Sequence, residues 1–200
     1  TFAARDGVPV SGVLYVPDRT PAPAVVLLPM LGRTHRDWDE AAARFVDAGI
    51  AVLAVDFRHT ALVDPDAADQ VSNPFAPLVL DAEAARAYLA ARPEVNPSRI
   101  GMAGASLGAN VAVLAAADDP LVRSLALLSV SLDYRGLKLE QALKRFASRP
   151  VLLVASSESR DEREGAWFSA FSHDLETGRS VPIPTSDALF AWRFRGLASF

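Results

Sequence analysis

The 200-residue chain contains no cysteine, which excludes disulfides, thiolate nucleophiles and cysteine-based zinc sites. It also has no surplus of positive charge, since 20 Lys and Arg residues against 24 Asp and Glu residues give a net charge of −4. Binding to nucleic acids or to anionic membranes needs such a surplus, so the sequence predicts neither as a partner. No apolar run is long enough for a membrane span, and no signal peptide opens the chain.

What is present is the composition of a soluble globular protein, with 50% hydrophobic and 22% charged residues. A chain of this length buries a core without disulfides, and no linker, repeat or low-complexity tract divides it. We predict one domain over residues 1–200, atypical from about residue 156, in which 188–194 fit a strand or a short helix. We expect a cytoplasmic protein by default, and because the chain begins at Thr1, a removed N-terminal segment is compatible with it.

Strand-like and helix-like segments alternate along most of the chain. Residues 1–4 and 8–15 surround the Asp6–Gly7 turn signal and predict a hairpin. Thr34 and Asp37 resemble a capping box before the first helix. Further strands are predicted at 24–28, 50–55, 99–104, 121–130 and 151–155, and helices at 38–49, 78–92, 107–117 and 137–147. The alternation favours an α/β fold, with a mostly parallel central sheet, an N-terminal antiparallel hairpin and helices on both faces.

Gly104-Ala105-Ser106-Leu107-Gly108 is a Gly-x-Ser-x-Gly motif between a predicted strand and a predicted helix. A serine on such a tight turn has a strained backbone, and small residues at 104 and 108 let the turn close against its neighbours. The hydroxyl then projects at the carboxyl edge of the sheet, where open α/β sheets bind ligands. The Leu107 N–H, at the helix N-terminus, is placed to stabilise an oxyanion. Ser106 is the candidate nucleophile, with a plain N-cap serine as the structural alternative.

The run from Pro97 to Asn110 resembles the nucleophile elbow of α/β-hydrolases, specifically of the dienelactone-hydrolase-like branch. Residues 25–32 and Asp56-Phe57-Arg58 resemble the oxyanion loop of that family and the turn after its next strand. The resemblance covers residues 8–158. It implies the α/β-hydrolase fold with an eight-stranded sheet, a Ser–acid–His triad and hydrolysis of carboxylic esters or lactones. Dienelactone hydrolases use a cysteine nucleophile, whereas this elbow carries serine, which favours a serine esterase.

The resemblance also implies a second oxyanion donor and a base. The donor maps to the backbone N–H of Leu31, with Met30 as the neighbouring alternative. The family's chain order of serine, acid and histidine selects His173, which alone of the three histidines follows the elbow. His35 and His59 follow strands that end at the same sheet edge, so both stay open as alternatives.

The acid of the triad is less well defined. The family position falls on Ser159, and a serine cannot carry the negative charge that supports an imidazolium. We expect Glu158, one residue earlier, to supply the carboxylate, with Asp161 and then Asp133 as alternatives. A solvated acidic loop without a catalytic role is the structural alternative.

No cofactor and no metal site are predicted, because the chain has no P-loop, no dinucleotide-binding glycine spacing and no paired histidines. The leading hypothesis is a serine hydrolase that cleaves small carboxylic esters or lactones through an acyl-enzyme intermediate. No insertion is long enough for a separate lid domain. The alternative hypothesis is a hydrolase-fold protein that has lost catalysis and binds a small apolar ligand, since the usual acid is missing. Acyl transfer or peptide cleavage by the same triad is a third possibility.

Overall fold

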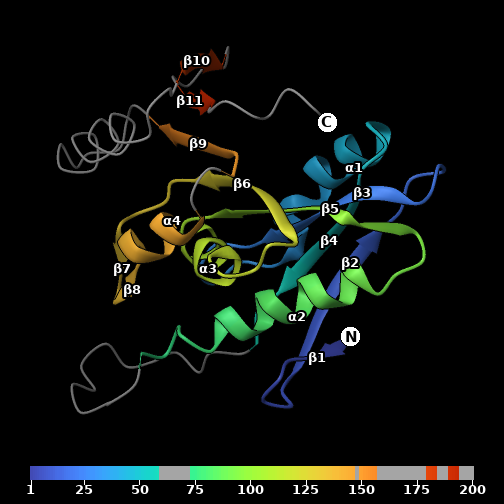
Figure 1. Ribbon diagram of the computed structural model, residues 1–200, viewed down its shortest axis with the longest axis horizontal. Coiled ribbons are helices and arrows are strands. Elements are labelled where there is room, and N and C mark those ends of the chain that lie inside the picture. The colour runs from blue at the N-terminus through green and yellow to red at the C-terminus, as the bar shows by residue number, and fades with distance from the viewer. Residues whose placement is uncertain (59–72, 147–148, 157–178, 184–188, 194–200) are drawn as a thin grey trace.

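A mostly parallel sheet runs through the molecule (Figure 1). The computed structural model describes residues 1–58, 73–146, 149–156, 179–183 and 189–193. Its strands are β1 (Phe2–Ala3), β2 (Pro9–Tyr15), β3 (Ala22–Leu28), β4 (Ala51–Asp56), β5 (Val95–Ala105), β6 (Val122–Leu128), β9 (Val151–Ser156), β10 (Arg179–Ile183) and β11 (Leu189–Arg193). Its helices are the 3-10 helix η1 (His35–Trp38) and α1 (Asp39–Asp47), α2 (Leu78–Ala90), α3 (Leu107–Ala116) and α4 (Glu140–Phe146).

The strand order in the sheet is β1-β2-β4-β3-β5-β6-β9-β11-β10. The central strands from β4 to β9 pair in parallel, and the predicted N-terminal hairpin pairs antiparallel at one edge. The predicted α/β architecture is therefore confirmed. The resemblance implied eight strands, whereas the described sheet is 9-stranded, because β9 is followed by an antiparallel hairpin of β11 and β10.

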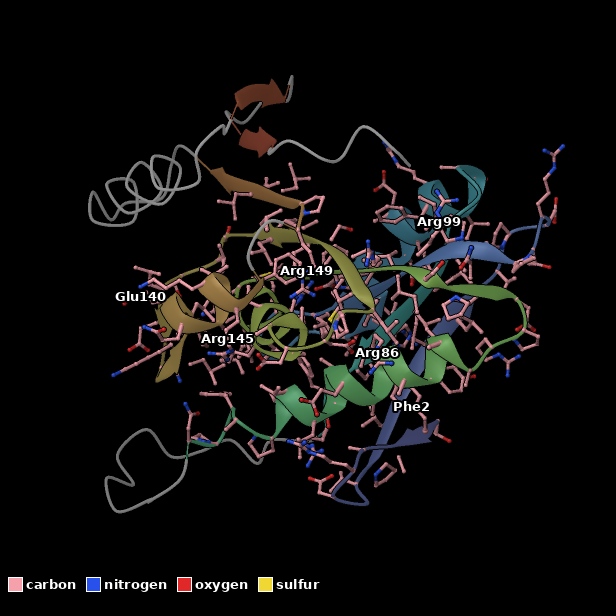
Figure 2. The ribbon with its side chains drawn as sticks, viewed as in Figure 1. Phe2, Arg86, Arg99, Glu140, Arg145 and Arg149 are labelled. Atoms are coloured by element: carbon pink, nitrogen blue, oxygen red, sulfur yellow. The ribbon has the colours of Figure 1, made fainter. Side chains whose placement is uncertain are left out.

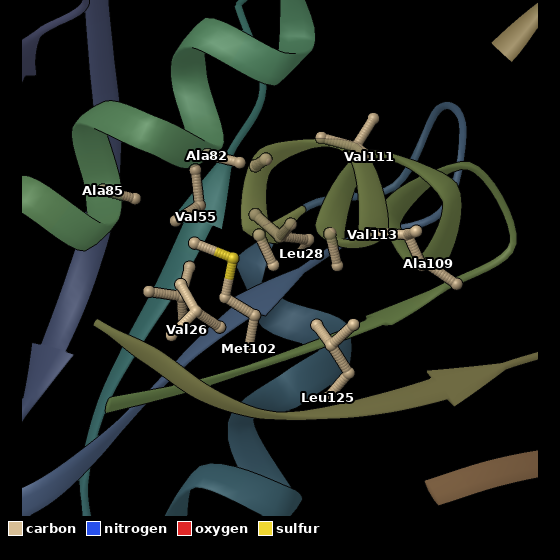
Figure 3. Close-up of a cluster of buried hydrophobic side chains, with 14 of the residues drawn as sticks. Val26, Leu28, Val55, Ala82, Ala85, Met102, Ala109, Val111, Val113 and Leu125 are labelled. Carbon is tan, nitrogen blue, oxygen red and sulfur yellow. The ribbon is translucent and has the colours of Figure 1, made fainter. Parts of the chain in front are cut away.

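Alternate residues of a strand face opposite sides of the sheet, so the apolar strands present buried side chains to both faces. Helices cover both faces. Leu27 of β3 packs in a cluster with Ala42 of α1. Its neighbours Val26 and Leu28 lie in the larger cluster with α2 and α3, shown in Figure 3. Each fully buried Val, Leu or Met side chain in these clusters contributes roughly 1.5–3 kcal/mol of transfer free energy. The two clusters hold the carboxyl ends of β3, β4 and β5 in fixed positions at one edge.

The capping box predicted at Thr34 is wrong. Thr34 makes no side-chain capping hydrogen bond, and η1 precedes α1. The expected partner, Asp37, instead accepts hydrogen bonds from Arg33 Nε and Nη2 at 2.5 and 2.7 Å. The guanidinium of Arg33 forms two charge-assisted hydrogen bonds with this carboxylate, and together they are stronger than the single hydrogen bond that a backbone N–H would donate.

The helix predicted at 137–147 begins later than expected, at Glu140. The preceding residues form a small antiparallel pair of β7 (Asp133–Tyr134) and β8 (Leu137–Lys138). The Asp133 carboxylate accepts a hydrogen bond from the Gly136 N–H at 2.6 Å and closes the turn between them. Residues 137 and 138 are therefore held in extended pairing when the helical pattern starts.

Arg149, labelled in Figure 2, joins the end of α3 to the start of β6. Its guanidinium donates to the carbonyl oxygens of Ala117, Asp119 and Val122 at 2.9, 2.6 and 2.9 Å. It also lies 3.8 Å from the centroid of the Phe146 ring of α4. A cation at these carbonyls satisfies the acceptors that a helix leaves free at its C-terminus. The contact anchors the helix that follows the elbow.

Candidate active site

Ser106 lies between the last residue of β5 and the first residue of α3, with φ 50° and ψ −117°. A non-glycine residue at such a positive φ stores roughly 1–3 kcal/mol of strain and persists only where its surroundings impose it. The Ser106 N–H donates to the Leu128 carbonyl at 2.8 Å, and the Ser106 carbonyl accepts from the Ala109 N–H at 3.0 Å. The Ser106 side chain makes no capping hydrogen bond, so the plain N-cap alternative does not describe it.

Two glycines make the turn around Ser106 possible. A Cβ at Gly104 would overlap the Gly108 carbonyl group and lie 2.7 Å from the Ala109 nitrogen. A Cβ at Gly108 would overlap the Leu28 carbonyl oxygen at the end of β3 and meet the Pro29 oxygen at 2.5 Å. Both glycines are thus required by close approach of backbone segments. The second contact places the loop after β3 directly against the elbow.

The loop after β3 carries the second predicted oxyanion donor. A hydrogen bond of 3.1 Å from the Arg33 N–H to the Met30 carbonyl closes a four-residue turn, with Gly32 at φ 71° in its third position. A positive φ there is typical of a type II turn, in which Leu31 takes the second position. Among the described residues, the Leu31 N–H donates to no backbone carbonyl. The Met30 and Leu31 side chains are 46% and 40% exposed.

Leu107, the first predicted donor, is the first residue of α3 and its side chain is buried. The first N–H groups of a helix have no partner within the helix and carry its positive dipole end. The structure thus brings the elbow and the loop after β3 into contact through Gly108, while the roles of Leu107 and Leu31 as donors stay predictions.

His35 has a carboxylate partner that sequence reasoning missed. The Asp56 side chain at the end of β4 accepts a hydrogen bond from the His35 N–H at 2.7 Å, and its other oxygen lies 2.8 Å from His35 Nδ1. The resemblance at Asp56-Phe57-Arg58 drew attention to Asp56, but no local pattern in the sequence indicated that it would contact a residue 21 positions away. The pairing exists because β3 and β4 are parallel neighbours.

Asn110 is a second residue that sequence reasoning missed. It is fully buried on α3, where its side chain donates to the Ser131 carbonyl at 2.8 Å and accepts from the Ser131 N–H at 3.2 Å. These bonds fix the loop after β6, the strand whose last carbonyl holds the elbow. The available signal was a lone amide in an otherwise apolar helix, since a buried polar side chain requires partners.

Arg58 ties the turn after β4 to two other elements. Its guanidinium pairs with the buried carboxylate of Asp81 on α2 at 2.6 Å and with Asp6 in the turn of the N-terminal hairpin at 2.5 Å. The hydrogen bonds that Arg58 donates to Asp6 and Asp81 raise the pKa of Arg58 above its usual value. The hydrogen bond from Arg58 lowers the pKa of Asp6 below its usual value. The network holds the end of β4, and with it Asp56, in place.

Four predicted site residues lie outside the described residues: the base His173, the acid Glu158, the alternative acid Asp161 and the alternative base His59. The further alternative acid, Asp133, is exposed and its carboxylate is engaged by the Gly136 N–H. The base and acid assignments therefore stay predictions.

In the described ranges, no group of three or more acidic or histidine residues is arranged to hold a metal ion. No described helix combines the length and the apolar character that crossing a membrane requires.

Residues 10–158 match the model of the dienelactone hydrolase family. No curated protein sequence is significantly similar to the chain.

Several solved structures resemble this one. DcsB, solved in complex with its substrate analogue, matches 91% of this chain and 57% of its own at 18% identity, with a TM-score of 0.56. The α/β hydrolase GrgF from Penicillium sp. sh18 matches 92% of this chain and 57% of its own at 20% identity, also at 0.56. An esterase of Pyrobaculum calidifontis matches 66% of this chain and 44% of its own at 26% identity, at 0.53. The chain spans little more than half the length of the first two, which establish the fold alone.

Proposed function

Because the chain belongs to the dienelactone hydrolase family, we propose that it is a serine hydrolase that cleaves small carboxylic esters or lactones. Family membership and the esterase neighbour support a hydrolase of this fold. The serine mechanism and the substrate class go beyond that. The observation that carries the serine mechanism is the strained backbone of Ser106, whose side chain is left free of the capping role that would otherwise explain it.

In the proposed reaction, Ser106 Oγ attacks the carbonyl carbon of the ester while His173 accepts the hydroxyl proton. The Leu107 and Leu31 N–H groups stabilise the oxyanion of the tetrahedral intermediate. The imidazolium then gives its proton to the leaving alkoxide, and the C–O bond to the alcohol breaks. Water, deprotonated by the same imidazole, then attacks the acyl carbon, the bond to Ser106 Oγ breaks, and the imidazolium returns its proton to that oxygen as the acid leaves. Glu158 orients the imidazole, with Asp161 and Asp133 as the alternatives.

One observation concerns the nucleophile, and another supports an ester with an apolar part. The chain has no cysteine, so the thiolate chemistry of dienelactone hydrolases themselves is excluded. The exposed side chains of Met30 and Leu31 flank the predicted donor on the loop that touches the elbow. An apolar group next to the scissile carbonyl would bury these side chains on binding, which is favourable at about 25 cal/mol per Å².

The experiment is intact mass spectrometry after treatment with a fluorophosphonate, which reacts covalently with activated serines. We expect one adduct on the wild-type chain and none on Ser106→Ala. Ser98→Ala is the matched control, because Ser98 is an exposed serine at the other end of the same strand. An adduct that persists in Ser106→Ala would overturn the nucleophile assignment.

Turnover of p-nitrophenyl esters and of a small lactone then tests the substrate class. Removing a triad serine or histidine costs on the order of 10⁶ in kcat in a serine hydrolase, so Ser106→Ala and His173→Ala should both lose at least about 1,000-fold. A loss below about tenfold on Ser106→Ala would reject covalent catalysis by this residue. Absence of both adduct and turnover in the wild-type chain would favour a protein that only binds a small apolar ligand.

A further inference from the structure

We infer that His35 and Asp56 form a clamp that positions the oxyanion loop, so that both are positioning residues for catalysis although neither touches the reacting atoms. The inference rests on the proposed function, in which the N–H of Leu31 stabilises an oxyanion. It assigns a role to the histidine–carboxylate pair that the described residues contain, at the sheet edge that carries Ser106.

The clamp fixes His35 at two points. One oxygen of Asp56 accepts the backbone N–H of His35 at 2.7 Å, and the other lies 2.8 Å from Nδ1. Because an ionised carboxylate only accepts hydrogen bonds, Nδ1 carries the proton. The two side chains are 23% and 28% exposed, so the charge-assisted bonds are partly shielded from water. Backbone and ring of His35 are therefore both held to the end of β4.

The opposite end of the loop is held to the elbow. The carbonyl oxygens of Leu28 and Pro29 lie against Gly108, the closing glycine of the Gly-x-Ser-x-Gly turn and the second residue after Ser106. Between this contact and His35 there are only five residues, from Met30 to Thr34. A segment this short with both ends fixed has few conformations.

The segment between the two anchors has further internal restraints. The turn from Met30 to Arg33 is closed by a hydrogen bond of 3.1 Å, and the Arg33 guanidinium is paired with Asp37 in η1. Leu31 is the second residue of that turn. The direction of its N–H is therefore determined by the elbow on one side and by the clamp on the other.

Releasing one anchor should affect the transition state more than the bound substrate. An oxyanion donor acts when it lies about 2.7–3.1 Å from the developing charge, and losing one such donor costs roughly 10²–10³ in kcat. A misplacement of about 1 Å costs on the order of 10². The ground-state carbonyl needs the donor less, so KM should change little.

A paired imidazole and carboxylate also resemble the base and acid of a triad, and His35 is an alternative base by position. The two roles are separated by His35→Asn. The asparagine side chain carries an N–H donor on the same Cγ atom that bears Nδ1, so it keeps the hydrogen bond to Asp56. It cannot accept and return a proton as imidazole does. If His35 is a positioning residue, activity survives this substitution, and if His35 is the general base, activity is lost.

The test compares His35→Ala, His35→Asn and Asp56→Ala with the wild-type chain. For each we would measure kcat and KM on a p-nitrophenyl ester, the melting temperature, and inhibition by an alkyl boronic acid, which forms a tetrahedral adduct with the nucleophile. We expect His35→Ala to lose about 10–100-fold in kcat with KM within about threefold. His35→Asn should recover to within about fivefold of the wild-type kcat, and boronic acid affinity should follow kcat.

The rescue should depend on the carboxylate. In the Asp56→Ala background, His35→Asn and His35→Ala should have the same kcat, because no acceptor is left for the asparagine N–H. Equal loss of activity in His35→Asn and His35→Ala in the wild-type background would overturn the clamp in favour of a reacting imidazole. Wild-type kcat in His35→Ala would overturn it as well. So would a loss of kcat that disappears when measured well below the melting temperature, because that loss reflects unfolding.

Failure of the clamp and failure of the proposed function give different results. If the proposed function fails, the wild-type chain forms no fluorophosphonate adduct on Ser106, and the clamp is overturned with it because there is no oxyanion to stabilise. If only the clamp fails, the wild-type chain still forms the adduct on Ser106, and either His35→Ala turns over at the wild-type rate or His35→Asn and His35→Ala lose activity equally.

Discussion

Gly104 lies directly against the backbone of Gly108, so that the two ends of the Ser106 turn touch. Any side chain at position 104 would overlap the carbonyl group of Gly108. The contact explains how Ser106 is kept at a positive φ, because the turn has no room to relax toward a helical or extended conformation.

Gly104→Ala should destabilise the protein by about 2–3 kcal/mol, because a rigid backbone group cannot move away from the added methyl group. Gly101→Ala, in the same strand, is the matched control. Its Cβ would meet only the Ser124 side-chain oxygen closely, at 2.9 Å, and that hydroxyl can rotate. Urea unfolding measures both free energies. Equal losses in the two variants would mean that the close approach at Gly104 is not what closes the turn.

Arg58→Met should lower the free energy of unfolding by about 3 kcal/mol, because it leaves the carboxylate of Asp81 buried without its guanidinium. Arg44→Met is the control, since the Arg44–Glu40 pair is exposed to water on both sides and contributes at most about 0.5 kcal/mol. The double variant Arg58→Met/Asp81→Leu should regain part of the loss. An effect no larger than that of Arg44→Met in chemical denaturation would contradict the network.

The pKa of Asp6 lies below its usual value of 3.8 because Arg58 donates hydrogen bonds to its carboxylate. The unfolded chain therefore takes up the proton at a higher pH than the folded chain does. The ionised carboxylate stabilises the fold above about pH 3.8, and this contribution is lost as the pH falls through the lower pKa of the folded state.

It follows that Asp6→Asn should be less stable than the wild-type chain near neutral pH, with a difference that shrinks as the solution is acidified below about pH 3.8. Urea midpoints of both proteins across this range provide the measurement. A difference that stays constant with pH would show that the charge of Asp6 does not stabilise the folded state.

Asn110→Ala should cost about 2 kcal/mol, because it leaves the partly buried N–H and carbonyl of Ser131 without their side-chain partner. We also expect kcat to fall, since the loop after β6 adjoins the strand that holds the Ser106 N–H. Asn96→Ala is the control, because the Asn96 side chain accepts its hydrogen bonds from Ser98 at the exposed start of β5. Thermal melts together with ester turnover test both effects, and a variant as stable and active as Asn96→Ala would refute them.

Much of the fold follows from local patterns in the sequence. The N-terminal hairpin, the parallel strands and the helices on both faces were predicted from turn residues and from hydrophobic periodicity, and the structure confirms them. Ser106 was identified for the same reason, because a Gly-x-Ser-x-Gly turn between strand and helix is a contiguous signal. Leu31, His173, Glu158 and the alternative acids came from the resemblance, and their roles stay predictions.

Local patterns failed where a competing partner was nearby in space. Thr34 and Asp37 had the spacing of a capping box, but Arg33 binds the carboxylate of Asp37 more strongly. Residues 137 and 138 fitted a helix, but Tyr134 and Asp133 pair with them as a strand. In both cases a side chain or strand outside the pattern offered a better set of hydrogen bonds.

The sequence by itself determined the fold class, the position of the candidate nucleophile and the exclusion of thiol chemistry, because each depends on residue types that stand together or are absent. Only the tertiary structure decided that His35 meets Asp56, that Asn110 holds Ser131 and that Arg58 joins Asp81 to Asp6. Those pairs are 21 or more positions apart in the chain. They meet because burial of apolar residues brings parallel strands and their helices together, and no local rule specifies which polar groups are then left facing one another.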